Sequence, residues 1–350
     1  MPSEAFRIDV HHHAIPPVYR EALSVRGITE SGGRDVPDWS PGLSLGVMDR
    51  NGIAVAVLSV SAPGVHFGDD AAARDLARRC NEASAELVAA HPSRFGFFAS
   101  LPMPDADGSA AEAVYALDEL GADGVVLMSS HHDGSYLGSP RFDAVLAELD
   151  RRSAVAFVHP LVPTFFDRID MGIPAFAMEF TFETTRAAFN LAHTGALERY
   201  PGIRFVLSHA GGTVPFLVGR FDLLWFTDDA LAERAPKGGT TYMRSLFYDT
   251  ALSANPHALS SLSELVGADH ILFGSDYPYA PELATQMTVD GLIRYPLTEA
   301  DRARVERGNA LDLLPSLARR LPGVGTPGSA PVAAGPDQPE HPSGEGATPR

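Results

Sequence analysis

Eight short segments rich in valine, isoleucine, leucine and phenylalanine recur along the chain, separated by longer segments with the apolar spacing of helices. The predicted strands are Arg7–His13, Ile53–Ser61, Arg94–Pro102, Gly124–Ser130, Ala154–His159, Ile203–His209, Leu246–Ala251 and His270–Asp276. The predicted helices are Asp70–Ala90, Ser109–Leu120, Ser139–Arg152, Phe182–Tyr200 and Pro256–Val266. Each helix is long enough to connect the end of one strand to the start of the next parallel strand. This alternation predicts an α/β fold, a (β/α)8 TIM barrel.

A doubly wound open sheet is the alternative fold. It would need a glycine-rich turn after the first strand, and the sequence there runs from His11 to Pro16 without a glycine. The barrel is expected to occupy residues 1–321 as one catalytic domain. The last 29 residues, 322–350, contain seven prolines and six glycines with almost no large apolar side chain, and are expected to form a disordered tail.

Composition excludes several classes of partner. The 27 basic and 44 acidic residues give a net charge of -17, which disfavours nucleic acid and anionic membranes. The single cysteine, Cys80, allows no disulfide and no thiolate metal site, as expected in a reducing cytosol. The N-terminus lacks the pattern of a signal peptide, and no apolar run reaches the roughly 18 residues of a membrane span. A cytoplasmic protein without a membrane segment is therefore expected.

Polar side chains gather at the ends of the predicted strands. Strand alternation predicts that Asp9, His11 and His13 share the inner face of the barrel while His12 points outward. His159 ends the fifth strand, His209 the sixth, and Asp276 the eighth. In this fold the carboxyl ends of the strands meet on the face where active sites are built. The set therefore predicts a metal site at the barrel mouth.

The chain resembles the amidohydrolase superfamily, in which His-x-His on the first strand, His on the fifth and sixth strands and Asp on the eighth surround one or two divalent metals. The resemblance extends over about residues 7–320. Within the superfamily the chain is most similar to the decarboxylase branch of aminocarboxymuconate semialdehyde, γ-resorcylate and methylsalicylate decarboxylases, with the methylsalicylate type nearest. The stretches that carry this similarity are Ile8–His13, Trp39–Pro41, Met48–Ile53, Pro92–Phe95, Leu101–Pro104, Thr184–Ala188, His209–Gly212 and Gly274–Pro278.

The resemblance implies that His11, His13, His159 and Asp276 bind the metal and that His209 acts as acid or base beside it, although His209 could instead be a further ligand. Asp276 or His209 would deliver the proton. The fourth strand has no lysine and the only lysine is Lys237, so a centre with one metal is favoured over a pair bridged by carboxylated lysine. Zinc suits a site rich in histidine, and manganese is the alternative.

Other residues are weaker candidates for the substrate site. Arg220 matches an arginine that related decarboxylases lend across a dimer interface, which implies a homodimer; a plain surface arginine is the alternative. Trp39, Phe182, Phe180 and Arg34 are candidates for the pocket, although aromatic residues in apolar segments are more often core. The glycines Gly211 and Gly212 form either a plain turn or a close approach to the substrate.

Three further histidines, His66, His131 and His132, follow strand ends and are expected in exposed loops that could line the opening to the substrate site.

Taken together, the residues and the resemblance predict a metal-dependent, non-oxidative decarboxylase, a carboxy-lyase acting on a small aromatic or unsaturated carboxylic acid. The alternative on the same site is a hydrolase of an amide, lactone or ester, which would release a new acid and no carbon dioxide. A barrel with a purely structural metal is a third possibility, but such a site would be closed by four protein ligands without a cavity.

Deletion of residues 322–350 tests the expected domain boundary. Because this segment has too few apolar side chains to pack, the shortened chain should keep its thermal stability and its turnover nearly unchanged. A large loss of either, measured by thermal unfolding and by product release, would show that the segment docks on the barrel.

Overall fold

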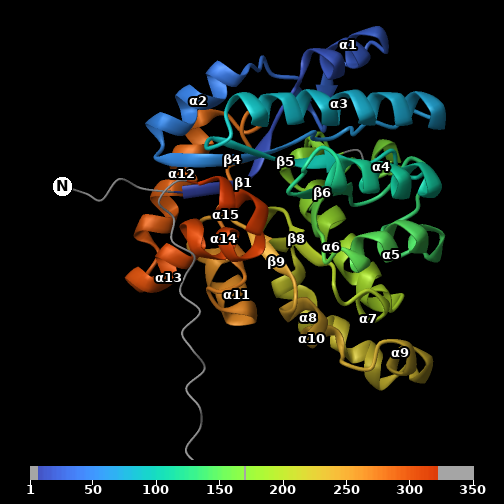
Figure 1. Ribbon diagram of the computed structural model, residues 1–350. Coiled ribbons are helices and arrows are strands. Elements are labelled where there is room, and N and C mark those ends of the chain that lie inside the picture. Colours follow the sequence, from blue (N-terminus) through green and yellow to red (C-terminus); the bar gives the residue numbers. More distant parts are fainter. Residues whose placement is uncertain (1–6, 169–170, 322–350) are drawn as a thin grey trace, which may run out of the picture.

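The computed structural model describes residues 7–168 and 171–321. Within them, eight parallel strands form one sheet, and each strand lies beside the next of the eight along the chain. The strands are β1 (Arg7–His13), β4 (Ile53–Ser59), β5 (Phe95–Ser100), β6 (Gly124–Met128), β7 (Val155–His159), β8 (Arg204–Leu207), β9 (Phe247–Asp249) and β10 (Ile271–Leu272). All eight predicted strands are present. Figure 1 labels β1, β4, β5, β6, β8 and β9.

The sheet closes on itself between β10 and β1. The backbone N–H of Val10 donates to the carbonyl of Phe273 at 3.0 Å, and the N–H of Asp276 donates to the carbonyl of His11 at 2.7 Å. An isolated parallel bridge joins His12 to Tyr277. The predicted (β/α)8 barrel is therefore confirmed.

Strand β10 is shorter than the predicted segment 270–276. The N–H of Phe273 donates to Val305 in the C-terminal helical segment at 3.0 Å, so the regular pairing with β9 ends at Leu272.

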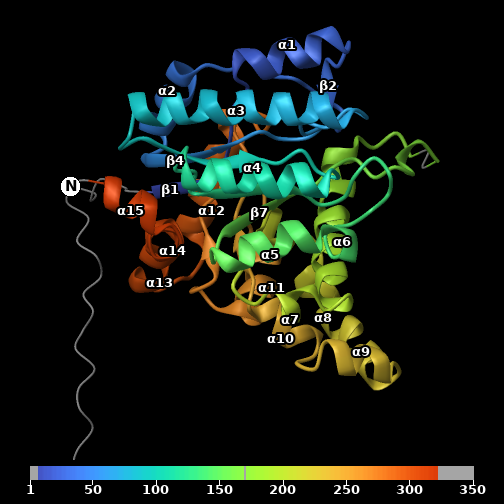
Figure 2. The same ribbon diagram turned by 45° about the vertical axis from the view of Figure 1, so that its right-hand side comes forward.

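Helices surround the barrel, and α3, α4 and α5 lie one after another along the same side (Figures 1 and 2). The helices between strands include α3 (Asp70–Ala90), α4 (Ala106–Asp118), α5 (Asp143–Arg151), α6 (Glu179–His193), α7 (Ala196–Arg199) and α11 (Pro256–Val266). The single helix predicted over 182–200 is in fact α6 and α7. Gly195, with φ of 74°, interrupts it in the left-handed conformation that ends helices.

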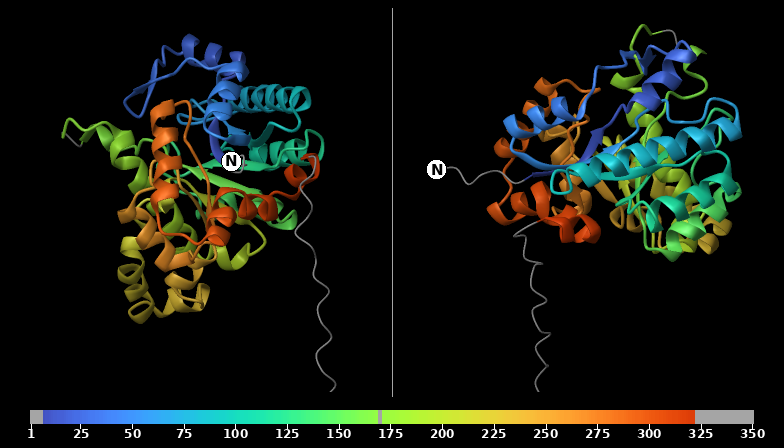
Figure 3. Two further views of the ribbon diagram at one scale, coloured as in Figure 1. Left: turned by 90° about the vertical axis from the view of Figure 1, so that its left-hand side faces the viewer. Right: turned by 45° about the horizontal axis from the view of Figure 1, so that its top comes forward.

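Insertions and a C-terminal extension complete the fold. After β1 come α1 (Pro17–Val25), the hairpin β2 (Glu30–Ser31) with β3 (Arg34–Asp35), and α2 (Pro41–Arg50). After β8 come α8 (Val214–Asp222), α9 (Asp229–Arg234) and α10 (Gly239–Arg244). The chain continues after β10 with α12 (Glu282–Arg294), α13 (Glu299–Ala303), α14 (Asn309–Leu313) and α15 (Pro315–Arg320). Figures 1 and 3 show these last helices beside the start of β1.

Two apolar layers follow from strand alternation. Val55, Val57, Val126 and Phe157 point into the barrel, where Leu317 of α15 joins the same cluster. The intervening residues pack under the surrounding helices, in a cluster that includes Ala56, Leu58, Val125, Ala156 and Val158. The C-terminal helices therefore close one end of the barrel, which leaves the carboxyl ends of the strands to form the site.

A bulge in β1 corrects the expected alternation of that strand. Asp9 pairs with Ala56 and His12 with Leu58, so two residues of β1 oppose the single residue Val57. Val10 consequently packs inside the barrel, and Asp9 lies with His12 on the helix-facing side, where its Oδ2 is 3.0 Å from His12 Nδ1. The prediction that Asp9 shares the inner face with His11 and His13 was wrong.

The predicted tail, 322–350, lies outside the described residues. Among the residues that the structure describes, none of the helices is both long and apolar enough to cross a membrane.

Candidate metal centre

Four buried side chains converge at the mouth of the barrel. His11 and His13 come from β1, His159 is the last residue of β7, and Asp276 follows β10. Each offers one ligand atom, and these atoms all lie within 4.8 Å of one another. The Nε2 atoms of His11 and His13 are 3.1 Å apart, and Asp276 Oδ1 lies 3.0 Å from His13 Nε2. The predicted ligand set is therefore brought together.

The hydrogen bonds of the three imidazoles fit a metal. His11 Nδ1 donates to the carboxylate of Asp249 at 2.7 Å, and His159 Nδ1 donates to the carbonyl of Pro160 at 2.9 Å. His13 Nδ1 lies 3.1 Å from Ser59 Oγ and 3.3 Å from the Ser59 carbonyl. With Nδ1 protonated, each Nε2 carries a lone pair aimed at the same point as the Asp276 carboxylate. Three nitrogens and one oxygen thus form a site for a single divalent metal.

The electrostatics of the cluster also favour a cation. Burial opposes the charge of His11, but the carboxylates of Asp249 and Asp276 outweigh it and raise its pKa to about 10. Burial also works against the Asp276 carboxylate, yet His11, His13 and His209 hold its pKa well below the usual range. The pKa of His159 is lowered well below its usual value, by burial and by the neighbouring histidines. The Asp276 carboxylate therefore stays charged at neutral pH.

Asp249, the last residue of β9, organises this centre and was missed by the sequence analysis. One oxygen accepts from His11, and the other accepts from the backbone N–H of His209 and of Ala251, each at 2.9 Å. Its carboxylate is fully buried. The signal was available in the sequence, because Asp249 interrupts an apolar strand at its carboxyl end, as Asp276 does.

His209 lies beside the ligands on a strained turn after β8. Its Nε2 is 3.5 Å from Asp276 Oδ2, and its buried Nδ1 has no hydrogen-bond partner. His209 and Ala210 have φ of 54° and 57°, a conformation that non-glycine residues rarely adopt. Gly211 and Gly212 continue the turn at positive φ, where a Cβ would clash with Tyr248 and with the Thr181 carbonyl. Packing therefore accounts for both glycines.

A cavity of about 190 Å³ opens on the metal ligands. His159, His209 and Asp276 form part of its wall, and Arg34 and Phe180 form another part. A cavity of about 150 Å³ is sufficient to hold a benzene ring. The space above the metal site therefore suits a compound with one aromatic ring.

Arg34, from the hairpin after β1, is the basic residue of this cavity. Its Nη2 donates to the carbonyl of Tyr279 at 3.1 Å, and its guanidinium carbon lies 5.0 Å from the centre of the Phe176 ring. These two contacts fix the guanidinium at the wall of the cavity, where it can bind a carboxylate.

Three other predicted site residues lie elsewhere. Phe182 lines a separate groove with Phe189 and Phe221, because it faces away from Phe180 on α6. Trp39 donates from Nε1 to Ser44 Oγ at 2.9 Å, and the same hydroxyl contacts His12, so Trp39 lies behind β1. Arg220 is exposed on α8. The structure therefore brings Phe180 and Arg34 to the metal cavity but not these three residues.

The histidines after β4 and β6 line a second cavity. His66 and His132 stack with their ring centres 4.9 Å apart, and both line this cavity together with His131. His132 is exposed as predicted, but His131 is only 4% exposed. The expectation of an exposed His131 was wrong, because the ring packs edge-on against the buried Phe142.

Comparisons with known proteins agree with this geometry. The sequence model of a family described as Amidohydrolase matches residues 8–315. The 6-methylsalicylic acid decarboxylase of Penicillium expansum is 38% identical over 322 residues, which cover 89% of this chain and 97% of that protein. The gamma-resorcylate decarboxylase of Rhodococcus jostii is 30% identical over 315 residues, covering 85% of this chain and 92% of that protein. A crystal structure of a dihydroxybenzoic acid decarboxylase from Polaromonas, with bound manganese and the inhibitor 2-nitroresorcinol, matches with a TM-score of 0.74 and 26% identity, covering 89% of this chain and 97% of that one.

Replacement of Asp249 by Asn tests its role in the centre. The variant keeps the shape of the side chain but removes the charge that orients His11, so metal affinity should fall by about 10- to 100-fold. The measurement is competition with a calibrated chelator. Asp123→Asn is the matched control, since Asp123 is also buried but contacts Ser316 and Arg320, and it should leave metal affinity unchanged. Equal affinities in both variants would contradict the assigned role of Asp249.

Proposed function

The chain belongs to the amidohydrolase family, and we propose that it is a metal-dependent, non-oxidative decarboxylase of a small hydroxybenzoate-type acid. The observation that carries this proposal is a ring-sized cavity with the metal ligands on one wall and Arg34 on another. Relatives that cover nearly all of this chain are decarboxylases of 6-methylsalicylic acid and γ-resorcylic acid. The chain is therefore a carboxy-lyase, in agreement with the resemblance to the decarboxylase branch.

The residues of the cavity bind and orient the acid. His11, His13, His159 and Asp276 would hold the metal, which when bound supplies a Lewis acid for the substrate carboxylate and an adjacent hydroxyl. Arg34, which also lines the cavity, binds a carboxylate oxygen, and Phe180 packs against the ring. Phe176, Leu252 and Ala280 add apolar surface to the same cavity.

Proton transfer falls to His209 and Asp276. They stand 3.5 Å apart at the wall of the cavity, so either can reach a ring carbon that lies against this wall. We assign His209 as the acid, because the Asp276 carboxylate also serves as a metal ligand. The proton adds to the carbon that bears the carboxylate, the carbon–carbon bond breaks, and its electron pair restores the aromatic ring as carbon dioxide leaves.

Zinc is the metal we propose, because three imidazole nitrogens and one carboxylate form the donor set that zinc prefers. Manganese is the competing metal, since the Polaromonas relative contains it. Cys80 is buried and unpaired, which is compatible with the proposed cytoplasmic location.

Purified protein should contain about one divalent metal per chain and release carbon dioxide from ortho-hydroxybenzoates. Removal of the metal should abolish this release because the carboxylate loses its binding partner, and addition of zinc or manganese should restore it. Metal analysis and a carbon dioxide assay provide the measurements. Full activity of the metal-free protein would refute the metal dependence, and cleavage of an ester or amide without carbon dioxide would favour the hydrolase.

A homodimer is the second part of the proposal. Arg220 lies on α8 near four exposed apolar side chains, Phe216, Leu223, Leu224 and Phe226, of which Phe216 is 84% exposed. Exposed apolar side chains on one segment are typical of protein interfaces. A second copy covering them would bring Arg220 toward the neighbouring subunit.

Mixed dimers test whether Arg220 is shared between subunits. Arg220→Ala and His159→Ala chains should each be nearly inactive, and mixing them should restore part of the activity, because one site of each hybrid has both an intact metal centre and an intact arginine. Activity is measured after exchange of labelled subunits. If demonstrated hybrids show no rescue, or if a monomer is fully active, Arg220 is not shared between subunits. Neither result would contradict the proposed metal chemistry.

A further inference from the structure

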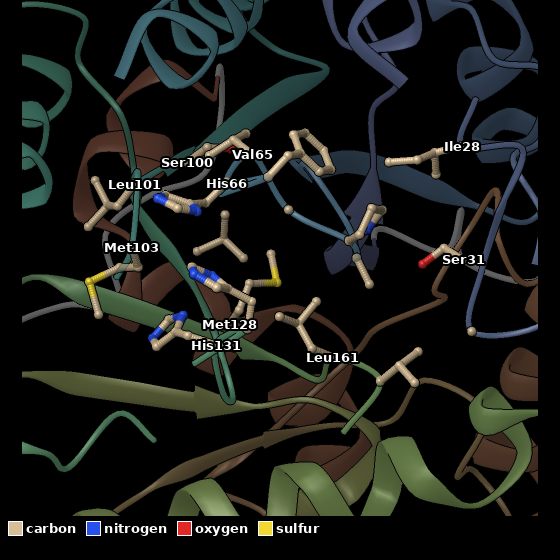
Figure 4. A pocket seen from close by; sticks show the side chains of 18 of the residues that line it. Ile28, Ser31, Val65, His66, Ser100, Leu101, Met103, Met128, His131 and Leu161 are labelled. Atoms are coloured by element: carbon tan, nitrogen blue, oxygen red, sulfur yellow. The ribbon is translucent and has the colours of Figure 1, made fainter. Parts of the chain in front are cut away.

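The mouth of the barrel contains a second cavity, which is larger than the one above the metal ligands. Its volume is about 530 Å³, against about 190 Å³ for the metal cavity. Its walls come from the ends of β4, β5 and β6, from the loop after β7 and from the insertion after β1. Figure 4 shows the following side chains on opposite sides of it: Leu101, Met103, Met128 and His131 on one side, Ile28 and Ser31 on the other.

The two cavities adjoin. Ser31 lines both. Gly32 lines the larger cavity and lies against Phe180 of the smaller one, so closely that a Cβ on Gly32 would be 2.6 Å from Phe180 Cζ. Leu161 of the larger cavity belongs to the same apolar cluster as Phe180. Ser31 therefore marks the boundary at which a substituent on a ring held at the metal would enter the larger cavity.

The larger cavity is mainly apolar, and one of the residues that line it, His131, has a buried polar atom without a partner. Leu101, Met103 and Met128 supply flexible apolar surface. His131 is 4% exposed, and its Nε2 is buried without a hydrogen-bond partner. Burial lowers the pKa of His131 to about 4 despite the nearby Asp133, so the imidazole is neutral. A buried polar atom without a partner is costly, and a rotation of the His131 ring toward the cavity would let a ligand oxygen satisfy it.

We propose that this second cavity is a substrate subsite, and that the preferred substrates are hydroxybenzoic acids with an apolar side chain of several carbons that carries an oxygen. The chain occupies the cavity lined by Met128, and its oxygen pairs with His131 Nε2. The proposal rests on the proposed function, because it names the substrate class of the same site.

Binding of phenols to the metal-loaded full chain tests the subsite without requiring turnover. Each methylene group removed from water raises affinity by about fourfold when fully buried. Titration calorimetry should therefore show that 3-pentylphenol binds at least about tenfold more tightly than phenol. Equal affinities, or undetectable binding of both, would overturn the proposal.

Filling the cavity should remove this preference. In Met128→Trp the larger side chain occupies the subsite, so the two phenols should bind with affinities within about threefold of each other. Val65→Trp, on another wall, provides a second variant in case the first fails to fold. Met287→Trp is the matched control, since Met287 is 66% exposed on α12, and it should keep the preference. A preference that survives in folded Met128→Trp and Val65→Trp would place the alkyl chain elsewhere and overturn the proposal.

His131→Phe tests the hydrogen bond. The phenyl ring keeps the apolar shape but removes Nε2. The ligands are 3-(hydroxyalkyl)phenols whose side chains have three to six carbons. For at least one of them, the loss of affinity caused by the substitution should be at least fivefold greater than the loss for 3-pentylphenol. If all of these phenols lose the same affinity as 3-pentylphenol, His131 does not bind the oxygen of the side chain. Carbon dioxide release from 6-methylsalicylate is measured separately, so failure of the decarboxylase proposal is distinguishable from failure of the subsite.

Discussion

The carboxylate of Asp249 is the interaction on which the metal centre depends. It joins three strand ends through hydrogen bonds. It accepts from the His11 side chain on β1, from the backbone N–H of His209 after β8, and from the backbone N–H of Ala251, which follows its own strand β9. A fully buried carboxylate is stable only when its hydrogen bonds and neighbouring charges compensate its lost hydration. Here the same contacts that compensate Asp249 also fix the ring of His11 and the turn that carries His209.

The barrel closure and the bulge in β1 position the remaining ligands. The bulge adds a residue on the inner face, so that Val10 fills the barrel interior while His11 and His13 reach its mouth. Hydrogen bonds from the chain after β10 to His11 then bring Asp276 to the same place. Consequently, the metal ligands come from the strands β7 to β10 and β1, and the mouth beside β4, β5 and β6 is left as a larger, mainly apolar cavity.

The architecture and the metal ligands could be predicted from the sequence because both leave periodic or positional signals. Strands with apolar runs and polar residues at their ends, such as His159 and Asp276, are visible without a structure. The bulge was not predictable, because alternation assigns Asp9 to the inner face. Phe180 and Phe182 show the same limit, since only the rotation of α6 determines which of the two rings reaches the cavity. The end of an apolar strand marks Asp249 in the sequence, but its hydrogen bonds to His11 and His209 are tertiary contacts that only the structure shows.

The most direct test of the account is a turnover of a hydroxybenzoic acid by the metal-loaded chain in deuterated water. Decarboxylation through proton transfer to the ring predicts one carbon dioxide per acid consumed and one deuterium at the carbon that lost the carboxylate, detected by mass spectrometry and NMR. Replacement of His209, which stands 3.5 Å from Asp276, should slow this incorporation without removing the metal. An acid that is consumed without carbon dioxide release, or a phenol without deuterium at that carbon, would contradict the account.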